Sequence, residues 1–284
     1  MTGVRWAGLG ENARWTVLSA ALLAGCGHPV PLRQFEYARP YDGEPRLAAE
    51  VEFEAGALTI GPGRPEDLYN MSLRYHADRF RPVGTFDGGR VTLGVESLRE
   101  GGLRIGGRPQ AARIGFSARP DLDLDLALGT GEAEVELGGL RLSRLGLNSG
   151  AGRVRLSFAV PNPGSCTEAS VAAAAGDIRL DRIGDSGCGT WRIDGGVGKV
   201  TIDLDGDWHR DGRIVISQGV GGVTLIAPAR LGLRVTLAGL LTRFAGDRFA
   251  RSGKSYTSEG YQEAVRHLEV DVRSAIGAVR VEWR

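Results

Sequence analysis

A short pattern of glycine and alternating apolar residues occurs six times between residues 131 and 281 of this 284-residue chain. Each copy reads glycine, any residue, then Val, Ile or Ala, any residue, and then Leu, Ile or Val. The first four intervals between copies are 21, 24, 22 and 23 residues. A pattern that returns at this spacing is typical of proteins that stack one unit on copies of itself. The six glycines are Gly131, Gly152, Gly176, Gly198, Gly221 and Gly277.

Apolar residues also stand at fixed distances on both sides of each glycine. They lie two and four positions after it and seven and five positions before it in every copy. Such alternation is typical of strands with one buried face, and glycine between two strands permits a tight corner. The fold class that we predict is all-β, a single-stranded β-solenoid (β-helix) of about 21–24-residue coils. We expect one continuous internal column formed by Val154, Ile178, Val200 and Val223.

Charged residues next to the glycines support stacking in one register. Glu132, Arg153, Asp177 and Lys199 each follow a repeat glycine, and their signs alternate from coil to coil. Parallel coils about 4.8 Å apart would place each charge beside an opposite one. The alternative is chance alternation on a solvated face.

Two cysteines occupy equivalent places in adjacent copies. Cys166 and Cys188 each lie ten residues before a repeat glycine. Stacked positions fall within the Cα separation of a disulfide, and an exported protein meets oxidising conditions. We therefore predict a Cys166–Cys188 bond, the alternative being two reduced, buried thiols.

The N-terminus has the charge-then-apolar order of an export signal. Arg5 and Arg14 precede an apolar run at 15–24, which is too short to span a bilayer. The following Cys26 completes a sequence that resembles the lipobox of bacterial lipoproteins, and this resemblance implies that Cys26 is acylated and anchors the chain in a membrane. The alternative is a plain secretory signal with a chance cysteine. Gly27 after it resembles the outer-membrane variant, so we expect a lipid-anchored envelope protein, on the periplasmic or surface side of the outer membrane if there are two membranes.

The chain divides into four parts. The second is rich in proline, so we expect an extended tether that holds the folded part away from the bilayer. In the third the alternating runs are shorter, and we expect it to cap the open first coil. The parts are a lipoprotein signal peptide at 1–25, a tether at 26–45, an N-terminal β region at 46–120, and solenoid repeats at 121–284 with an insertion at about 240–266.

The insertion gathers aromatic and basic residues, and residues 259–267 within it have the composition of a short helix. Insertions of this kind often carry binding in repeat proteins. The alternative is an aromatic flap packed on the solenoid. The candidate interaction residues are Arg243, Phe244, Arg248, Phe249, Tyr256 and Tyr261.

The sequence gives little support for nucleic-acid binding, a metal site or catalysis. The net charge of +1 gives no general attraction to nucleic acid. Asp203, Asp205, Asp207 and Asp211 are compatible with a calcium site, the alternative being an outward polar turn. The four histidines show no metal-ligand spacing, and no nucleophile and base can be paired. We expect no catalytic residue, no metal site and no cofactor.

Three segments resemble the toast-rack family of bacterial envelope proteins, which includes a domain of cell-wall-active-antibiotic response proteins. They are AGALTIGPG near Gly56, the run from Pro120 to Phe158, and the run that begins at Ser255. The resemblance spans roughly residues 46–284 and implies an envelope protein without catalytic residues.

We therefore expect a non-catalytic cell-envelope lipoprotein that presents a rigid β-solenoid surface to an unknown envelope protein or glycan, linked to envelope stress response or adhesion. The alternative is a carbohydrate-active β-helix enzyme that acts on an envelope polysaccharide. An enzyme would cluster charged residues on one outward groove, whereas the outward columns here alternate in sign and then become neutral at Thr201, Gly222 and Thr224.

Overall fold

The computed structural model describes residues 32–98, 110–239 and 241–284. The predicted signal peptide, Cys26 and the first residues of the predicted tether lie outside these ranges. The described chain is all-β and forms one open sheet of sixteen strands. The strands are β1 (Arg33–Pro40), β2 (Arg46–Pro62), β3 (Asp67–Tyr75), β4 (Phe80–Asp87), β5 (Arg90–Ser97), β6 (Ala111–Phe116), β7 (Asp121–Glu136), β8 (Arg141–Ser157), β9 (Glu168–Asp181), β10 (Thr190–Asp203), β11 (Gly212–Ala227), β12 (Leu231–Ala238), β13 (Leu241–Ala245), β14 (Phe249–Ser252), β15 (Ser255–Ser258) and β16 (Arg266–Trp283).

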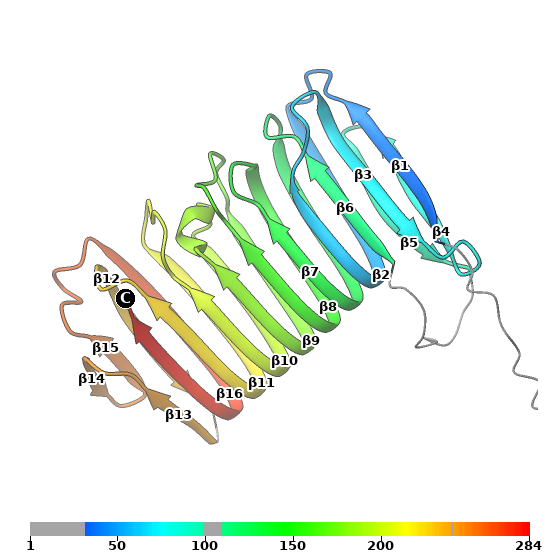
Figure 1. Ribbon diagram of the computed structural model, residues 1–284. Helices are drawn as coiled ribbons and strands as arrows, with labels where there is room; N and C mark the ends of the chain where they lie inside the picture. The colour runs from blue at the N-terminus through cyan, green and yellow to red at the C-terminus, as the bar shows by residue number, and fades with distance from the viewer. Residues whose placement is uncertain (1–31, 99–109, 240) are drawn as a thin grey trace, which may run out of the picture.

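Seven long strands form the repeating part, and we call β2, β7, β8, β9, β10, β11 and β16 the rungs. Each rung is bent into two arms, and all the bends lie along one edge of the molecule (Figure 1). Neighbouring rungs pair in parallel, with repeat glycine opposite repeat glycine, as at Gly131 and Gly152 or Gly198 and Gly221. The rungs therefore stack in the register that the glycine spacing predicts.

The predicted internal column is confirmed. The pairing runs from Val154 to Ile178, from Ile178 to Val200 and from Val200 to Val223, and all four side chains are buried. The core lies between the two arms of the rungs. Its largest fully buried side chain is Trp191, which meets Phe158 edge to face at 6.3 Å between ring centroids. Alternation thus buries one face of both arms.

The repeat glycines are required for two reasons. Gly198 has a φ of +147°, a conformation that residues with a side chain rarely adopt. In addition, a Cβ at residue 198 would lie 1.7 Å from the carbonyl oxygen of Gly176 on the preceding rung. Close stacking of the bends therefore excludes a side chain, which adds to the backbone freedom expected from the sequence.

The N-terminal end differs from the prediction. We call the stack of seven rungs the rack. It begins with β2, because Gly56 pairs with Gly131. The cap on β2 consists of β5 and β4 beside its first arm and β6, β3 and β1 beside its second. Arg33–Pro40, expected in an extended tether, instead forms β1 and pairs with β3. A proline is tolerated there because β1 is the edge strand and Pro40 is its last residue.

The C-terminal end also departs from simple chain order. The last strand, β16, lies between β11 and β12, and β12 and β13 pair in parallel with its two arms. Together they resemble one more rung, in which Thr242 stands opposite Gly277. The sequence pattern missed this unit because it lacks the glycine. The expected helix at 259–267 is wrong: turns lead directly into β16, and the only helical element in the described ranges is a 3₁₀ turn at Ile183–Ser186.

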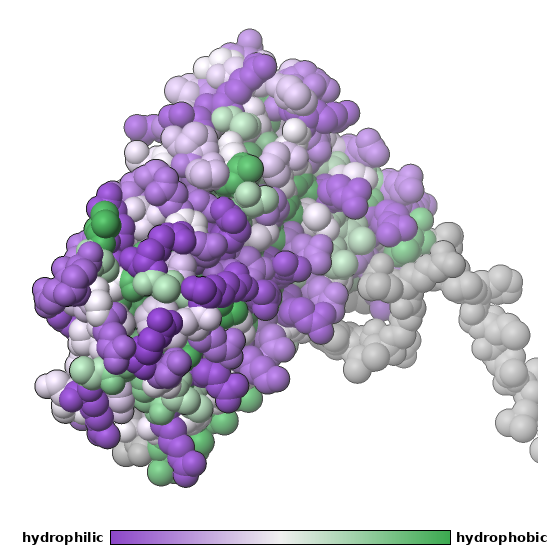
Figure 2. All heavy atoms as spheres, turned by 60° about the vertical axis from the view of Figure 1, so that its left-hand side comes forward, coloured by the Kyte–Doolittle hydropathy of each residue, from purple (hydrophilic) through white to green (hydrophobic). Residues whose placement is uncertain are grey.

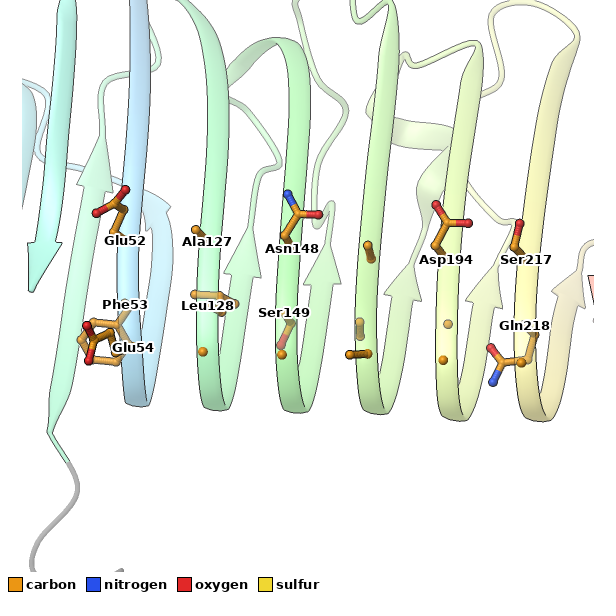
Figure 3. Close-up of a pocket in the computed structure, with 18 of the residues that line it drawn as sticks. Glu52, Phe53, Glu54, Ala127, Leu128, Asn148, Ser149, Asp194, Ser217 and Gln218 are labelled. Carbon is orange, nitrogen blue, oxygen red and sulfur yellow. The ribbon is translucent and has the colours of Figure 1, made fainter. Parts of the chain in front are cut away.

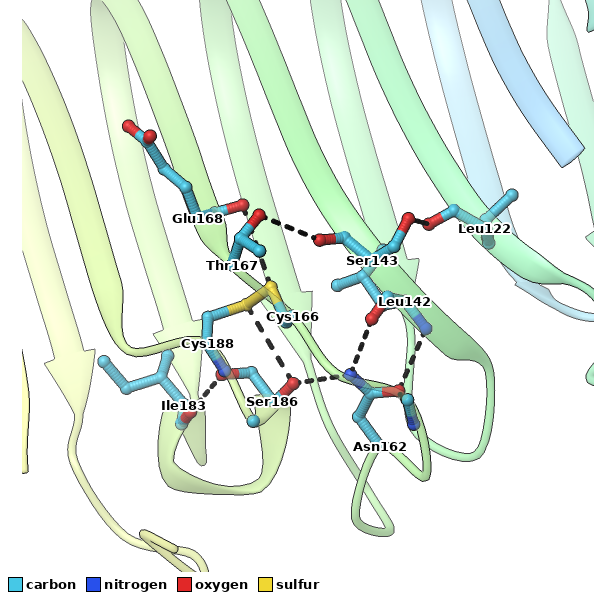
Figure 4. The surroundings of a disulfide bond; sticks show 12 residues. Leu122, Leu142, Ser143, Asn162, Cys166, Thr167, Glu168, Ile183, Ser186 and Cys188 are labelled. Atoms are coloured by element: carbon cyan, nitrogen blue, oxygen red, sulfur yellow. Dashed lines mark hydrogen bonds between the residues drawn. A yellow bond between two sulfur atoms is a disulfide. The ribbon is translucent and has the colours of Figure 1, made fainter. Parts of the chain in front are cut away.

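The predicted disulfide is confirmed. Cys166 and Cys188 are bonded across adjacent turns, with their Cα atoms 4.4 Å apart (Figure 4). The neighbouring Asn162 is buried; its amide nitrogen donates to the carbonyl oxygens of Leu142 (3.1 Å) and Ser186 (2.6 Å). These bonds tie three successive turns together at the edge opposite the bends.

The charge ladder is present in its register. Glu132 pairs with Arg153 and Arg153 with Asp177, and the first of these contacts is an ion pair of 2.6 Å between exposed side chains. Asp177 accepts a hydrogen bond from the backbone N–H of Lys199 at 3.2 Å. Exposed pairs contribute little energy, so the ladder favours one register more than it stabilises the fold.

Candidate binding groove and the C-terminal flap

A long open groove runs beside the bends and crosses all seven rungs. Its volume is about 1140 Å³, and each rung contributes the residues four, three and two positions before its bend glycine (Figure 3). At about 4.8 Å per strand, six intervals give a length of roughly 29 Å. The in-register stack therefore creates one continuous surface from short, separated sequence segments.

The groove has a floor of small residues. The position two before the glycine is Gly or Ala on the six rungs from β7 to β16, and the position before that is Ala173 on β9 and Gly195 on β10. Small side chains leave the backbone accessible, so an extended molecule could lie across the strands. Polar side chains of Asn148, Asp194 and Ser217 stand on the first-arm side (Figure 3).

The two ends of the groove carry opposite charge. Glu52, Glu54 and Glu96 line the β2 end, and Arg273 lines the β16 end. An enzyme groove would gather charged side chains over at least three adjacent rungs. Over β7, β8 and β9 this groove is lined by Ala, Leu, Gly, Asn and Ser. Its geometry suits binding of an extended ligand more than acid–base chemistry.

The flap, residues 241–258, places most of the predicted interaction residues at the end of the rack. Phe244 stacks on Tyr256 at 4.0 Å and meets Phe249 edge to face at 5.1 Å. Phe249 stacks on Trp283 at 5.5 Å, and these rings pack against the core. Phe244, Phe249 and Tyr256 thus make the flap cover the C-terminal end of the stacked rungs. This agrees with the alternative interpretation of the insertion, an aromatic flap packed on the solenoid. Arg248 lies over the ring of Trp283 at 4.9 Å.

Two predicted residues are separate from this cluster. Arg243 is exposed on β13, where it pairs with Ala278. Tyr261 lies in a second, polar hollow of about 480 Å³, where its ring contacts His267 at 4.7 Å. The guanidinium of Arg234 lies 4.7 Å from the centre of the same ring. The six residues therefore do not form one site, and their role in partner binding stays a prediction.

The aspartate-rich segment forms a turn whose carboxylates contact the protein. Asp203 pairs with Arg284 at 2.9 Å and Asp205 with Arg230 at 2.7 Å, while Asp211 accepts a bond from a backbone N–H. A hydrogen bond from the backbone of Gly206, together with Arg230, lowers the pKa of Asp205 below its usual value. Within the described ranges no group of three or more His, Cys, Asp or Glu could hold a metal ion.

One sequence feature of the groove is visible without the structure, but it predicts only a tight turn between two strands. Gly or Ala stands two positions before each repeat glycine, and in the sequence alone this indicates only a tight turn. The positions before it differ in residue type from rung to rung, so they show no periodic pattern. Only the stacking shows that these positions share one surface.

The protein is a repeat protein with an extended surface. Its bent rungs stack in register, the flap covers its C-terminal end, and a long groove crosses the rungs. No helix in the described part of the chain has the length and apolarity needed to cross a membrane. The chain belongs to the toast-rack family: the model of the N-terminal domain of toast_rack, DUF2154, matches residues 31–181.

Solved structures with similar shape come from several bacteria. A candidate cell adhesion protein of Clostridium sporogenes is 14% identical, with a TM-score of 0.41, over 89% of this chain and 100% of its own. A candidate adhesin of Bacteroides fragilis is 9% identical, with a TM-score of 0.44, over 88% and 96%. A candidate lipid-binding protein of Parabacteroides distasonis is 9% identical, with a TM-score of 0.39, over 88% and 96%. Similarity at this level carries no information on partner or activity. A search of curated proteins found no match.

Proposed function

We propose that this chain is a non-catalytic lipoprotein of the cell envelope, anchored through an acylated Cys26, that binds an extended envelope component in its groove. The ligand is a glycan strand or a protein segment of the envelope, and adhesion or a link to envelope stress response follows from that binding. We interpret the rack as a single-stranded β-solenoid, with coils of about 21–24 residues that each contribute one rung.

The observation that carries the proposal is the groove that crosses all seven rungs. A register fixed by glycine contacts holds its lining in place before any ligand arrives, which lowers the ordering cost of binding. Opposite charges at its two ends would give a bound chain a preferred direction. The lipobox-like sequence before Cys26 supports the anchor.

The groove is tested with a substitution that fills it. Ala172 on β9 is half-buried in the middle of the groove, and Ala172→Trp should obstruct it without altering the bends. The matched control is Glu134→Trp, an exposed position on the second arm of β7. Deleting residues 244–261 would be a poorer probe, because the aromatic flap packs on the core.

We expect Ala172→Trp to reduce, several-fold, both co-sedimentation with isolated peptidoglycan and recovery of partners from detergent-solubilised envelope, while Glu134→Trp binds as the wild type does. Equal binding by both variants in both assays would reject the groove as the binding site.

The anchor is tested separately. Cells fed a clickable fatty acid should label the wild-type protein and leave Cys26→Ser unlabelled, and the variant should leave the membrane fraction. Labelling of Cys26→Ser, or wild-type protein that is unlabelled and fully soluble, would contradict acylation at this residue.

A further inference from the structure

A stripe of exposed aliphatic side chains runs along the bends, next to the groove. It occupies the position just before the bend glycine on β10, β11 and β16 and the equivalent place at Leu241. Val197, Val220, Ile276 and Leu241 are 60%, 45%, 51% and 68% exposed, respectively. Each pairs with the next in register, so they form one unbroken stripe, which we call the bend ridge. Hydrophobic residues occur along the lower edge of the molecule, where the bends lie, interspersed with hydrophilic ones (Figure 2).

Single exposed aliphatic residues are common on protein surfaces, whereas a contiguous apolar stripe usually marks an interaction surface. All four side chains of the ridge are at least 45% exposed, so the ridge belongs to the surface of the molecule.

Basic residues flank the ridge. Lys199 and Arg243 follow the bend on β10 and β13, and Arg273 precedes it on β16. All three side chains are exposed, and within the described ranges no carboxylate forms a salt bridge with them, although Asp177 on β9 accepts a hydrogen bond from the backbone N–H of Lys199. In the same flanking columns on these strands the single acid is Asp194. An apolar stripe bordered by exposed basic groups matches the chemistry of an anionic lipid surface.

The described chain also begins at this edge. Arg33, the first residue of β1, pairs with Tyr75, and the neighbouring Arg74 pairs with Ala111. Ala111 in turn pairs with Ala57, the residue after the bend glycine of β2. Arg33 lies seven positions after Cys26, so the two residues can be at most about 25 Å apart. A lipid on Cys26 would therefore hold the bend edge, and not the opposite edge, near the bilayer.

We infer that the bend ridge is a membrane-contact surface, so that the rack lies with its bends against an anionic bilayer. The acylated Cys26 holds the β1 end, and the ridge with Lys199, Arg243 and Arg273 holds the β16 end. This orientation rests in part on the acylation proposed above, whereas contact between ridge and lipid does not. It places the groove beside the headgroups and turns the disulfide-linked edge away from them.

The test measures the depth of single labelled positions in vesicles. In the acylated, disulfide-bonded protein an introduced cysteine is the only free thiol. Val220→Cys and Ile276→Cys report on the ridge, and Val160→Cys is the matched control, because Val160 is 52% exposed in the turn between β8 and β9 at the opposite edge. Each variant of the full protein is labelled with an environment-sensitive fluorophore and reconstituted with phosphatidylglycerol and phosphatidylcholine.

Doxyl-labelled lipid should quench the labels at 220 and 276 at least about twofold more than the label at 160. Equal quenching at all three positions would overturn the inference. Shielding of the labels at 220 and 276 in detergent, together with a doubled mass, would assign the ridge to a second copy of the chain and would also overturn it.

Failure of the anchor is distinguishable from failure of the ridge. If wild-type protein takes up the thiol label, Cys26 is free and the proposed acylation fails. Flotation of that protein with the same vesicles then tests the ridge alone: Ile276→Glu with Leu241→Glu should lower the bound fraction several-fold, and Val160→Glu should not. No difference between these variants would refute contact between ridge and lipid.

Discussion

At the scale of single residues, the fold depends on positions where no side chain fits. The bend glycines of neighbouring rungs are so close that a Cβ on one would overlap the carbonyl group of the bend glycine on the preceding rung. This constraint is stronger than a need for positive φ, because even Gly277, which is not among the positive-φ glycines, has a carbonyl 1.8 Å from where a Cβ would be.

Gly198→Ala should therefore destabilise the protein by about 2–4 kcal/mol, since it combines a strained φ with overlap against the Gly176 carbonyl. Gly253→Ala is the matched control: Gly253 has a φ of +60° but nothing within 4 Å of a Cβ, so the cost should be only about 1 kcal/mol. Urea unfolding of both variants measures the difference. Equal destabilisation would show that stacking does not exclude the side chain.

A second prediction at this scale concerns pH. The folded-state pKa of Asp205 is lowered, by the backbone of Gly206 first and then by Arg230, so this carboxylate stabilises the fold above the ordinary aspartate pKa of about 3.9. The contribution is lost as the pH falls below that value through the lowered folded-state pKa. Between neutral pH and about pH 3 the wild type should lose more stability to urea than Asp205→Asn does. An identical loss in the two proteins would contradict this account.

At the scale of elements, both ends of the rack are protected against pairing with other chains. At one end the edge strands are β14, which has four residues and includes Arg251, and β13, which has five and includes Arg243. At the other end they are β1 and β4, which carry charged residues and a proline each. Short and charged edge strands disfavour edge-to-edge association. The flap adds a hydrophobic cover over the last rung.

Removing one ring of that cover should loosen the flap without unfolding the rack. Phe244→Ala loses contacts with Tyr256 and Phe249, and because Phe244 is half-buried we expect a local cost of roughly 2 kcal/mol, below that of a fully buried ring. Hydrogen exchange followed by mass spectrometry should quicken in β13–β15 and stay unchanged in β8 and β9. Phe35→Ala, at the other end, should quicken exchange in β1 only. Faster exchange throughout the rack after Phe244→Ala would mean that the flap supports the whole fold.

At the scale of the whole molecule, the sequence predicts what repeats and misses what interrupts the repeat. The columns around Val200 and the cysteine spacing were sufficient to place neighbouring rungs and the disulfide, because both follow from one register. The insertion of β16 between β11 and β12 could not be predicted, since Thr242 replaces the glycine that marks a bend. Pairing of β1 was missed because its single proline and its charges suit an edge strand as well as a tether.

The groove and the bend ridge belong to this same scale. Each is assembled from single positions on successive rungs, none of which is distinctive alone. Both surfaces therefore exist only if the rungs stack in register, and any slip of the register would divide them.

The register is tested most directly by oxidative crosslinking of paired cysteines. Glu134 and Arg155 are exposed and pair across β7 and β8, so Glu134→Cys with Arg155→Cys should form a disulfide readily on mild oxidation. Glu134→Cys with Arg153→Cys is displaced by two residues, roughly 8 Å between Cα atoms, and should stay reduced. Crosslinking of the second pair in preference to the first would contradict the in-register rack on which the fold, the groove and the ridge depend.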